Sequence, residues 1–327
     1  MPLNETRASL PSAPTKKILL YHPGAEAICE AVLSRYPELQ LDIATDDTDF
    51  ARKLVDTAII IGQRFDPSPL CNARALEWLH VTLAGIDFLA PVKHYLGDAI
   101  VTNARGIIAD HIANYVVGAI VHLRWDFPAV IRNQDAKVWR RWATEPLSGQ
   151  VACIVGVGAI GQEIANRVTA MGMTAVGVRE SGLPAPGLSR VFGPHELEDA
   201  LSIADFVVLA LPSTPRTARL IGPGEFKAMK RSAFLINIAR GAVVDETALV
   251  AALEHKLIAG ACLDVFVEEP LPDSSPLWRF PNVTISPHSS GLTTDYDQRN
   301  AALIVDNLER YRSNQPLRNV VDLSQAL

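Results

Sequence analysis

The sequence predicts an α/β fold in which helices cover parallel β-sheets, and three observations lead to this class. Short apolar runs typical of strands alternate with segments typical of helices along almost the whole chain. One of these runs leads directly into a glycine-rich turn and a helix-forming segment. The third observation is the composition, because 327 residues with 48% hydrophobic and 20% charged content have room for two globular domains.

The composition also excludes several classes of partner and site. A formal net charge of −6 gives no reason to expect nucleic acid as a partner. No apolar run approaches the roughly eighteen residues needed to span a bilayer, and the polar residues 1–17 lack the core of a signal peptide and are expected to fray. The four widely spaced cysteines lack metal-ligand spacing and are expected to be buried free thiols. We therefore expect a cytoplasmic protein with no membrane partner and no metal site.

The first hundred residues predict one parallel α/β unit. Its expected helices are residues 25–35 and 49–54, and its expected strands are residues 17–21, 39–43, 57–61, 78–81 and 99–103. This unit contains no glycine-rich phosphate loop, so we do not expect it to hold a dinucleotide. A long apolar helix at 107–123 leads out of it, and Trp139 and Trp142 in the following segment are expected to serve packing and interfaces.

The rest of the chain predicts a second unit with enough strands for a complete doubly wound domain. Its expected helices are residues 160–171, 195–203 and 245–255, and its expected strands are residues 151–155, 174–178, 205–211, 233–237, 259–264 and 283–286. A helix at 294–311 precedes a tail too short to be a domain, which we expect to fold back on the first unit. The predicted domains are residues 1–103 with 292–327, and residues 104–291.

The turn that follows the first strand of the second unit has the spacing of a dinucleotide-binding βαβ unit. Gly156 permits a tight turn, Gly158 lets the backbone approach a pyrophosphate, and Gly161 lets helix and strand pack closely. Ala159 and Ile160 begin the helix, whose free N–H groups and positive dipole end attract phosphate. Many matches to this pattern are only glycine-rich turns, but a buried strand before it and a helix after it favour dinucleotide binding.

The candidate site residues lie just after the strands of the second unit, because ligands bind at the carboxyl ends of strands in an open α/β sheet. The candidate cofactor contacts at these strand ends are Leu211, Pro212, Ser213, Thr217, Ile238, Ala239, Arg240, Asp264, His288 and Gly291. The segment after 259–264 also contains Glu268 and Glu269. One arginine, two or three carboxylates and one histidine thus gather around a nucleotide site. That set suits hydride transfer to a carbonyl group beside a carboxylate.

With these residues in view, the chain resembles the D-2-hydroxyacid dehydrogenases, and in particular their glyoxylate/hydroxypyruvate reductase branch. The likeness covers nearly the whole chain and consists of motifs in one order: Ala84-Gly85-Ile86-Asp87, the turn at 151–161, LPSTPRT, NIARG, LDVFVEEP and SPHSSG. Several motifs in one order are far more specific than any one alone. The resemblance implies two Rossmann-like domains, one flavodoxin-like and one dinucleotide-binding, with parallel sheets and an active-site cleft between them.

Three residues are the expected catalytic groups. Arg240 carries the planar fork that grips a carboxylate and polarises the neighbouring ketone, although an arginine after a strand can also form a plain surface ion pair. His288 is the natural proton donor, because imidazole titrates near neutrality, although a histidine in such a loop is often unremarkable. The family's motif matches Glu269, directly before Pro270, as the carboxylate that favours the imidazolium, and leaves Glu268 as a solvated competitor.

Further contacts follow from the resemblance. Asp264 could accept a hydrogen bond from the nicotinamide carboxamide, and capping a turn is an equally good role for it. The loop at Leu83, Ala84 and Gly85 in the first unit would bind the substrate, with backbone N–H groups offered to its carboxylate. The remaining histidines show no motif and are expected to be structural: His22, His80, His94, His111, His122, His195 and His255.

The position that selects the cofactor departs from the family's commoner pattern. About twenty residues past the glycine turn, where an acidic residue marks NAD, this chain has Arg179, followed by Glu180 and Ser181. Arg179 can pair with a 2′-phosphate and Ser181 can add a hydroxyl donor, whereas an inward Glu180 would restore the preference for NAD. Two solvated charges would instead leave the enzyme indifferent. We expect NADPH or NADP to be preferred and NADH or NAD to be possible.

These inferences together predict a homodimeric oxidoreductase that reduces a small 2-oxo acid to the D-2-hydroxy acid. The absence of a long insertion or regulatory domain favours a small acid such as glyoxylate or hydroxypyruvate. A rival from another class is an NAD(H)-sensing binding protein like the C-terminal-binding-protein corepressors, which share this fold. A relative acting on formate or phosphite is disfavoured, because His288 is paired with a glutamate and nothing marks a one-carbon or inorganic substrate.

Overall fold

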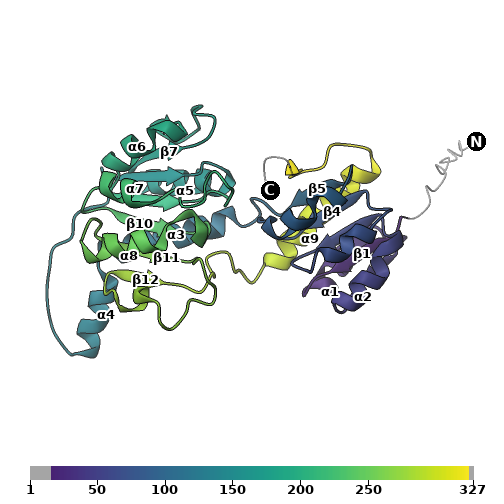
Figure 1. Cartoon of the computed structure of the whole chain (residues 1–327), viewed down its shortest axis with the longest axis horizontal. Helices are drawn as coiled ribbons and strands as arrows, with labels where there is room; N and C mark the ends of the chain where they lie inside the picture. Colours follow the sequence, from purple (N-terminus) through teal and green to yellow (C-terminus); the bar gives the residue numbers. More distant parts are fainter. Residues whose placement is uncertain (1–15, 324–327) are drawn as a thin grey trace, which may run out of the picture. The chain divides into compact units, whose positions relative to one another are not determined.

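The computed structural model describes residues 16–323, which divide into two compact units (Figure 1). Unit 1 comprises the residues up to Arg105 together with those from Asp295 onward, and unit 2 comprises Gly106–Thr294. From the sequence, the boundaries between the two units are predicted at 103/104 and 291/292. The expected fraying of the N-terminal segment concerns residues that lie almost entirely outside the described range.

Unit 1 is built on a five-stranded parallel sheet. In sheet order the strands are β2 (Leu41–Ile43), β1 (Ile18–Tyr21), β3 (Ile59–Gly62), β4 (Trp78–Val81) and β5 (Ile100–Asn103). Alternate strand residues face opposite layers, as the period of two requires. On one face they pack against helix α2 (Asp47–Lys53), and on the other against α1 (Ala25–Arg35) and α9 (Tyr296–Arg312). Helix α9 thus returns the end of the chain to the core of this unit.

Unit 2 is built on a seven-stranded parallel sheet. Its strands in order are β12 (Val283–Ile285), β11 (Gly260–Leu263), β10 (Phe234–Asn237), β9 (Phe206–Leu209), β6 (Val151–Val155), β7 (Thr174–Val178) and β8 (Arg190–Phe192). Helices α3 (Ala109–Arg124) and α5 (Ala159–Ala170) cover one face, and α6 (Leu197–Ile203), α7 (Pro223–Ala228) and α8 (Glu246–Glu254) cover the other. The two predicted parallel α/β sheets are therefore confirmed.

The order of the strands in unit 2 decides which loops meet. The chain passes from β6 outward to β7 and β8, then returns to β9 on the other side of β6 and continues to β12. The crevice where the direction reverses is where ligands bind in such sheets. The loops after β6, β7 and β9 therefore lie beside one another at this point, and those after β10, β11 and β12 follow along the same edge.

Three elements of unit 2 are not anticipated by the sequence pattern. Helix α4 (Phe127–Asp135) has nine residues, and although Phe127, Val130 and Ile131 are spaced to share one face, none of its residues is buried. Strand β8 has only three residues and helix α7 only six. The expectation for the cysteines is right for Cys153 and Cys262, which are buried, and wrong for Cys71, which is exposed.

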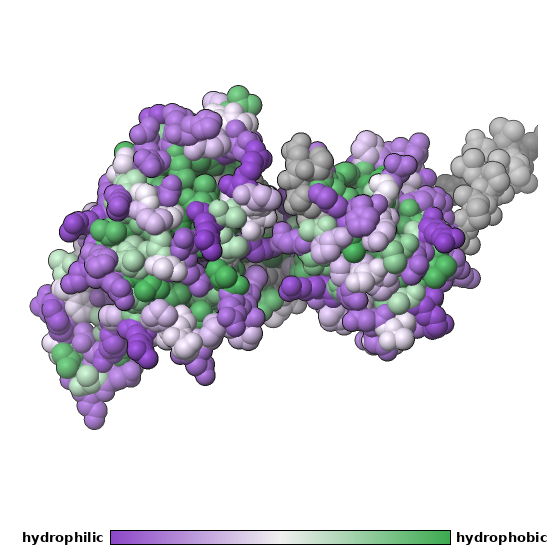
Figure 2. Space-filling view, in the orientation of Figure 1, coloured by the Kyte–Doolittle hydropathy of each residue, from purple (hydrophilic) through white to green (hydrophobic). Residues whose placement is uncertain are grey.

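The segment around α4 carries large apolar side chains on the surface. Phe127, Ile131, Val138 and Trp139 are all exposed, and Trp139 is 95% exposed. Figure 2 shows apolar patches at the tip of this segment among mainly hydrophilic surroundings. Within residues 16–323 no helix is long and apolar enough to cross a membrane.

Candidate active site

The glycine turn after β6 forms a cradle of unpaired donors at the start of α5. None of the backbone N–H groups from Val157 to Gly161 donates a hydrogen bond to another described residue. Gly156 has φ +102°, and a Cβ there would lie 2.5 Å from the Ala210 carbonyl oxygen. A Cβ at Gly161 would lie 2.1 Å from the Gly156 oxygen, whereas one at Gly158 would meet nothing within 4 Å. Packing thus requires glycine at 156 and 161, and the open space at Gly158 fits a phosphate group of a dinucleotide.

A second loop, residues 211–217, follows β9 beside this cradle. The Thr217 hydroxyl donates to the Pro212 carbonyl at 2.7 Å and accepts from the Thr214 N–H at 2.7 Å, so it fixes the loop from within. Leu211 and Ser213 are half-buried, and Pro212 is exposed. Thr217 was predicted as a cofactor contact. Its hydroxyl is already engaged within the loop, because it binds the Pro212 carbonyl and the Thr214 N–H.

Arg240 is placed by a buried asparagine at the end of β10. The Asn237 side chain accepts from the Ala239 N–H at 3.0 Å and donates to the Arg240 carbonyl at 3.1 Å. Ile238 and Ala239 are buried, while the Arg240 side chain is half-buried and donates to the Ala239 carbonyl at 2.7 Å. Asn237 stands in the NIARG motif but is not among the predicted site residues, although a polar residue ending an apolar strand is a signal for such a role.

The turn that carries Arg240 is pressed against the loop that carries Glu269. A Cβ at Gly241 would lie 1.9 Å from the Phe266 carbonyl carbon and 2.3 Å from the Val267 nitrogen. Only glycine permits this approach, because the obstructing atoms are backbone atoms that cannot turn aside. The close contact brings the β10 and β11 loops together at one edge of the sheet.

Glu269 connects His288 to this loop. One of its oxygens accepts from the Phe266 N–H at 3.0 Å, and the other lies 2.8 Å from His288 Nδ1. Partial burial opposes ionisation of Glu269, but the hydrogen bonds from His288 and Phe266 and the charges of His288 and Arg240 together lower its carboxyl pKa below the ordinary value. Glu268 is exposed. The contact leaves His288 Nε2 as the ring atom available to a substrate.

His288 is held in an unusual backbone conformation. Its φ is +51°, in the left-handed region that few non-glycine residues occupy. The surrounding loop maintains it, because the His288 N–H donates to the Asp264 carbonyl at 2.8 Å. Six other non-glycine residues among the described ones also have positive φ, so the conformation of His288 supports a functional role only together with its contact to Glu269.

Asp264 is the residue that organises the loop after β12. It is completely buried, and its two oxygens accept from the Ser286 hydroxyl at 2.5 Å, the Ser289 N–H at 2.9 Å and the Ser290 N–H at 3.0 Å. The Tyr115 hydroxyl lies 2.6 Å from Ser286 Oγ and donates to it, because the only Ser286 proton is directed to Asp264. Of the two roles considered for Asp264, its contacts are those of a turn cap.

The remaining predicted residues belong to other segments of the chain. Gly291 packs against helix α3, since a Cβ there would lie 3.1 Å from Ile108 Cδ1. In unit 1, Leu83 is half-buried against the core and Ala84 is exposed. The Ala84 carbonyl accepts from Asn103 Nδ2 at 2.7 Å, and the N–H groups of Ala84 and Gly85 donate to no other described residue. That loop thus offers two adjacent free donors.

The cofactor-selecting position follows β7. The Arg179 side chain is half-buried and has no hydrogen bond or ion pair within the described part of the chain. Glu180 is exposed, and its Oε1 lies 2.8 Å from a guanidinium nitrogen of Arg216. Ser181 is exposed. Glu180 is therefore engaged by a residue of a different loop, and Arg179 is not.

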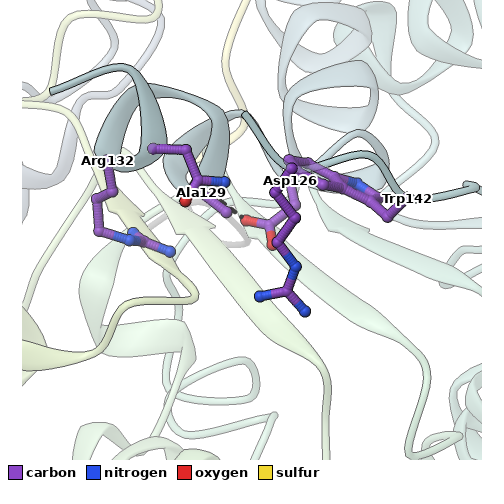
Figure 3. Close-up of a pocket in the computed structure, with 6 residues that line it drawn as sticks. Asp126, Ala129, Arg132 and Trp142 are labelled. Atoms are coloured by element: carbon purple, nitrogen blue, oxygen red, sulfur yellow. Dashed lines mark hydrogen bonds between the residues drawn. The ribbon is translucent and has the colours of Figure 1, made fainter. Parts of the chain in front are cut away.

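A hollow of about 320 Å³ lies outside this region. It is lined by Asp126, Ala129, Arg132, Asn133, Arg140 and Trp142, around the N-terminus of α4 (Figure 3). The Asp126 side chain caps this helix by accepting from the Ala129 N–H at 3.1 Å. None of the predicted catalytic or cofactor residues lines it, so it is separate from the candidate active site. No group of His, Cys, Asp and Glu suited to a metal ion occurs between residues 16 and 323.

Comparison with known proteins gives consistent results. A family model described as D-isomer specific 2-hydroxyacid dehydrogenase, NAD binding domain, matches residues 117–290. A glyoxylate reductase of Korarchaeum cryptofilum (strain OPF8) is 36% identical over 315 residues, which cover 90% of this chain and 93% of that protein. A glycerate dehydrogenase of Methylorubrum extorquens is 32% identical over 257 residues, which cover 76% and 79%.

Solved structures show the same likeness. A D-isomer specific 2-hydroxyacid dehydrogenase family protein from Aeromonas salmonicida subsp. salmonicida A449 matches with a TM-score of 0.86 and 30% identity over 94% of this chain and 99% of that one. A D-isomer specific 2-hydroxyacid dehydrogenase from Xanthobacter autotrophicus Py2, solved in complex with NADPH and MES, matches with a TM-score of 0.87 and 26% identity over 96% and 100%.

The role of Asp264 as a turn cap gives a prediction. Asp264→Asn retains one acceptor oxygen and places an amide NH₂ opposite a donor, so the loop 286–290 should loosen. We expect the Ser289 and Ser290 amides to exchange hydrogen about 10- to 100-fold faster, as hydrogen bonds to charged groups contribute about 1.5–3 kcal/mol. Hydrogen exchange measured by mass spectrometry tests this, with the exposed Glu268→Gln as a control. Unchanged exchange in Asp264→Asn would mean that other contacts hold the loop.

Proposed function

The chain belongs to the D-isomer specific 2-hydroxyacid dehydrogenase family and is an oxidoreductase, and on that premise we propose that it reduces a small 2-oxo acid to the D-2-hydroxy acid with NADPH. The observation that carries the proposal is the 2.8 Å contact between Glu269 and His288 on a loop next to the Arg240 turn. A carboxylate-supported imidazole beside a guanidinium can both hold a 2-oxo acid and deliver a proton to it.

The proposed mechanism divides the work among three side chains. The Arg240 guanidinium binds the substrate carboxylate and draws electron density from the adjacent carbonyl. When bound, the dihydronicotinamide supplies the hydride to that carbonyl carbon. His288 donates a proton from Nε2 to the carbonyl oxygen, since its Nδ1 faces Glu269. Glu269 holds the ring at Nδ1, so that Nε2 is directed to the substrate before the reaction begins.

The backbone supplies the remaining proposed contacts. The free N–H groups of Val157 to Gly161 and the space at Gly158 suit the pyrophosphate, with the 211–217 and 238–239 loops beside it. The paired donors of Ala84 and Gly85 in unit 1 suit a substrate carboxylate. Because Asp264 already accepts three hydrogen bonds in a buried position, we assign it to holding the His288 loop.

The substrate is proposed from the relatives. Proteins named glyoxylate reductase and glycerate dehydrogenase are among those that the chain resembles at 30% identity or more. A panel of 2-oxo acids with NADPH and NADH, followed through the absorbance of the reduced cofactor, tests the proposal. We expect glyoxylate and hydroxypyruvate to give the highest kcat/KM. No turnover with any 2-oxo acid, together with tight dinucleotide binding, would favour the corepressor-like alternative.

The contact between Glu269 and His288 predicts a change in the pH profile. The carboxyl pKa of Glu269 lies below its ordinary value, so the carboxylate that contacts His288 Nδ1 is lost only as the pH falls through that lowered pKa. We expect kcat for reduction to decline on this acid limb in the wild type. Glu269→Gln is neutral throughout, so it should have a lower kcat at neutral pH and no decline of this origin. The pH dependence of kcat, with Glu268→Gln as the control, measures this. A profile equal to that of the wild type would exclude a role for Glu269.

The unpaired Arg179 predicts the cofactor preference. Its guanidinium is free to bind a 2′-phosphate, with Ser181 as a second donor. We expect kcat/KM to be higher with NADPH than with NADH, and Arg179→Asp to reduce that ratio about 10- to 100-fold, the range for losing hydrogen bonds to a charged group. Equal efficiency with both cofactors in the wild type, or an unchanged ratio in the variant, would show that Arg179 does not bind the phosphate.

The exposed apolar segment around α4 supports the proposal of a homodimer. Phe127, Ile131, Val138 and Trp139 leave an apolar surface uncovered on unit 2. We expect a mass in solution of about twice the 35.5 kDa chain at micromolar concentration. Ile131→Glu with Trp139→Glu should give the single-chain mass, whereas Val55→Glu on unit 1 should not. A monomeric wild type by light scattering would contradict the dimer.

A further inference from the structure

Two loops that are distant in sequence meet at the end of β7. Arg216, in the loop after β9, places a guanidinium nitrogen 2.8 Å from Oε1 of Glu180, which directly follows Arg179. Strand β6 and its glycine turn lie between β9 and β7 in the sheet, so Arg216 reaches from one side of the glycine turn to the other. It therefore ends beside the position that distinguishes the ribose hydroxyl of NADH from the 2′-phosphate of NADPH.

The ion pair between Arg216 and Glu180 is weak enough for Arg216 to change its partner. The two side chains are 73% and 71% exposed, and ion pairs in water contribute little to stability. Neither side chain makes another hydrogen bond or ion pair within residues 16–323. Arg179, Glu180 and Arg216 carry two positive charges and one negative charge, so the cluster has an excess of one positive charge that a phosphate dianion can complement.

We propose that Arg216 is a second specificity-determining residue, which exchanges Glu180 for the 2′-phosphate when NADPH binds. The phosphate carries more charge than the carboxylate and presents three acceptor oxygens, which two guanidinium forks can share. Glu180 is then a competitor inside the site: it occupies Arg216 in the absence of a phosphate and is released when one arrives. The inference rests on the proposed preference for NADPH and assigns part of it to a different loop.

The two members of the pair should act in opposite directions. Arg216→Ala removes a phosphate ligand, so the affinity for NADPH should fall about tenfold, the lower end for a hydrogen bond to a charged group because the site is exposed. The affinity for NADH should change by less than about twofold, since it offers no 2′-phosphate. Glu180→Gln frees Arg216, so the affinity for NADPH should rise about two- to threefold. A pair that only stabilised the two loops would lose affinity for both nucleotides in either variant.

Calorimetric binding to the full chain tests these expectations without any 2-oxo acid. NADPH and NADH are the ligands, and 2′,5′-ADP against 5′-AMP isolates the adenosine end of the site. Arg231→Ala is the matched control, because it removes the same charge from an exposed residue just before β10, at the amino edge of the sheet. That variant should bind all four ligands as the wild type does.

Opposite effects of Arg216→Ala and Glu180→Gln on NADPH, with NADH unaffected, support the inference. If the wild type prefers NADPH and Arg216→Ala keeps the full preference, this inference fails while the role of Arg179 stands. Parallel losses for both nucleotides in both variants would also overturn it, by showing a structural pair. If the wild type binds both nucleotides equally, the NADPH preference fails and this inference fails with it.

Discussion

The arrangement of the candidate site depends on one buried carboxylate. Asp264 directly follows β11 and accepts three hydrogen bonds from the loop after β12, including two from consecutive backbone N–H groups. A buried carboxylate is costly unless its oxygens are satisfied, so the loop must adopt the conformation that satisfies them. In that conformation His288 takes a positive φ, and its ring reaches Glu269. Asp264 thus positions His288 through the loop that carries it, and it need not touch substrate or cofactor to do so.

The parallel sheet of unit 2 brings the candidate site residues, which are far apart in the sequence, to one edge. Parallel strands place all their carboxyl ends on the same side, so the glycine turn, Arg240, Glu269 and His288 follow one another along it. Two close backbone approaches bring neighbouring loops together, at Gly156 against Ala210 and at Gly241 against Phe266. These glycines set distances between loops, whereas Gly158 leaves space for a ligand. The same motif therefore contains structural and ligand-facing glycines.

Much of the fold could be predicted from local pattern, because buried strands such as 151–155 and 174–178 are uninterrupted apolar runs bounded by breaks. Helix α4 was not predicted, because it has only nine residues and buries no face, although Phe127, Val130 and Ile131 share one side of it and Asp126 caps it. Strand ends indicated where chemistry could occur, but not which side chains meet; the expectation that Glu269 lies beside His288 came from the family resemblance and not from spacing. The three donors of Asp264, the contact of Glu269 and the pairing of Glu180 with Arg216 join residues between 19 and 36 positions apart. Such contacts depend on loop conformations that no spacing rule specifies.

The stereochemical fate of the hydride tests the central claim most directly. Hydroxypyruvate would be reduced with NADPH that carries deuterium at the transferred position of its nicotinamide ring, and the glycerate product separated by chirality and weighed by mass spectrometry. If the site acts as proposed, the product of the wild type is D-glycerate with one deuterium at C2. The rate at which this product forms should be about 10²- to 10⁴-fold lower in His288→Ala, the range for losing a general acid. L-glycerate, unlabelled glycerate, or equal product from His288→Ala would contradict the account.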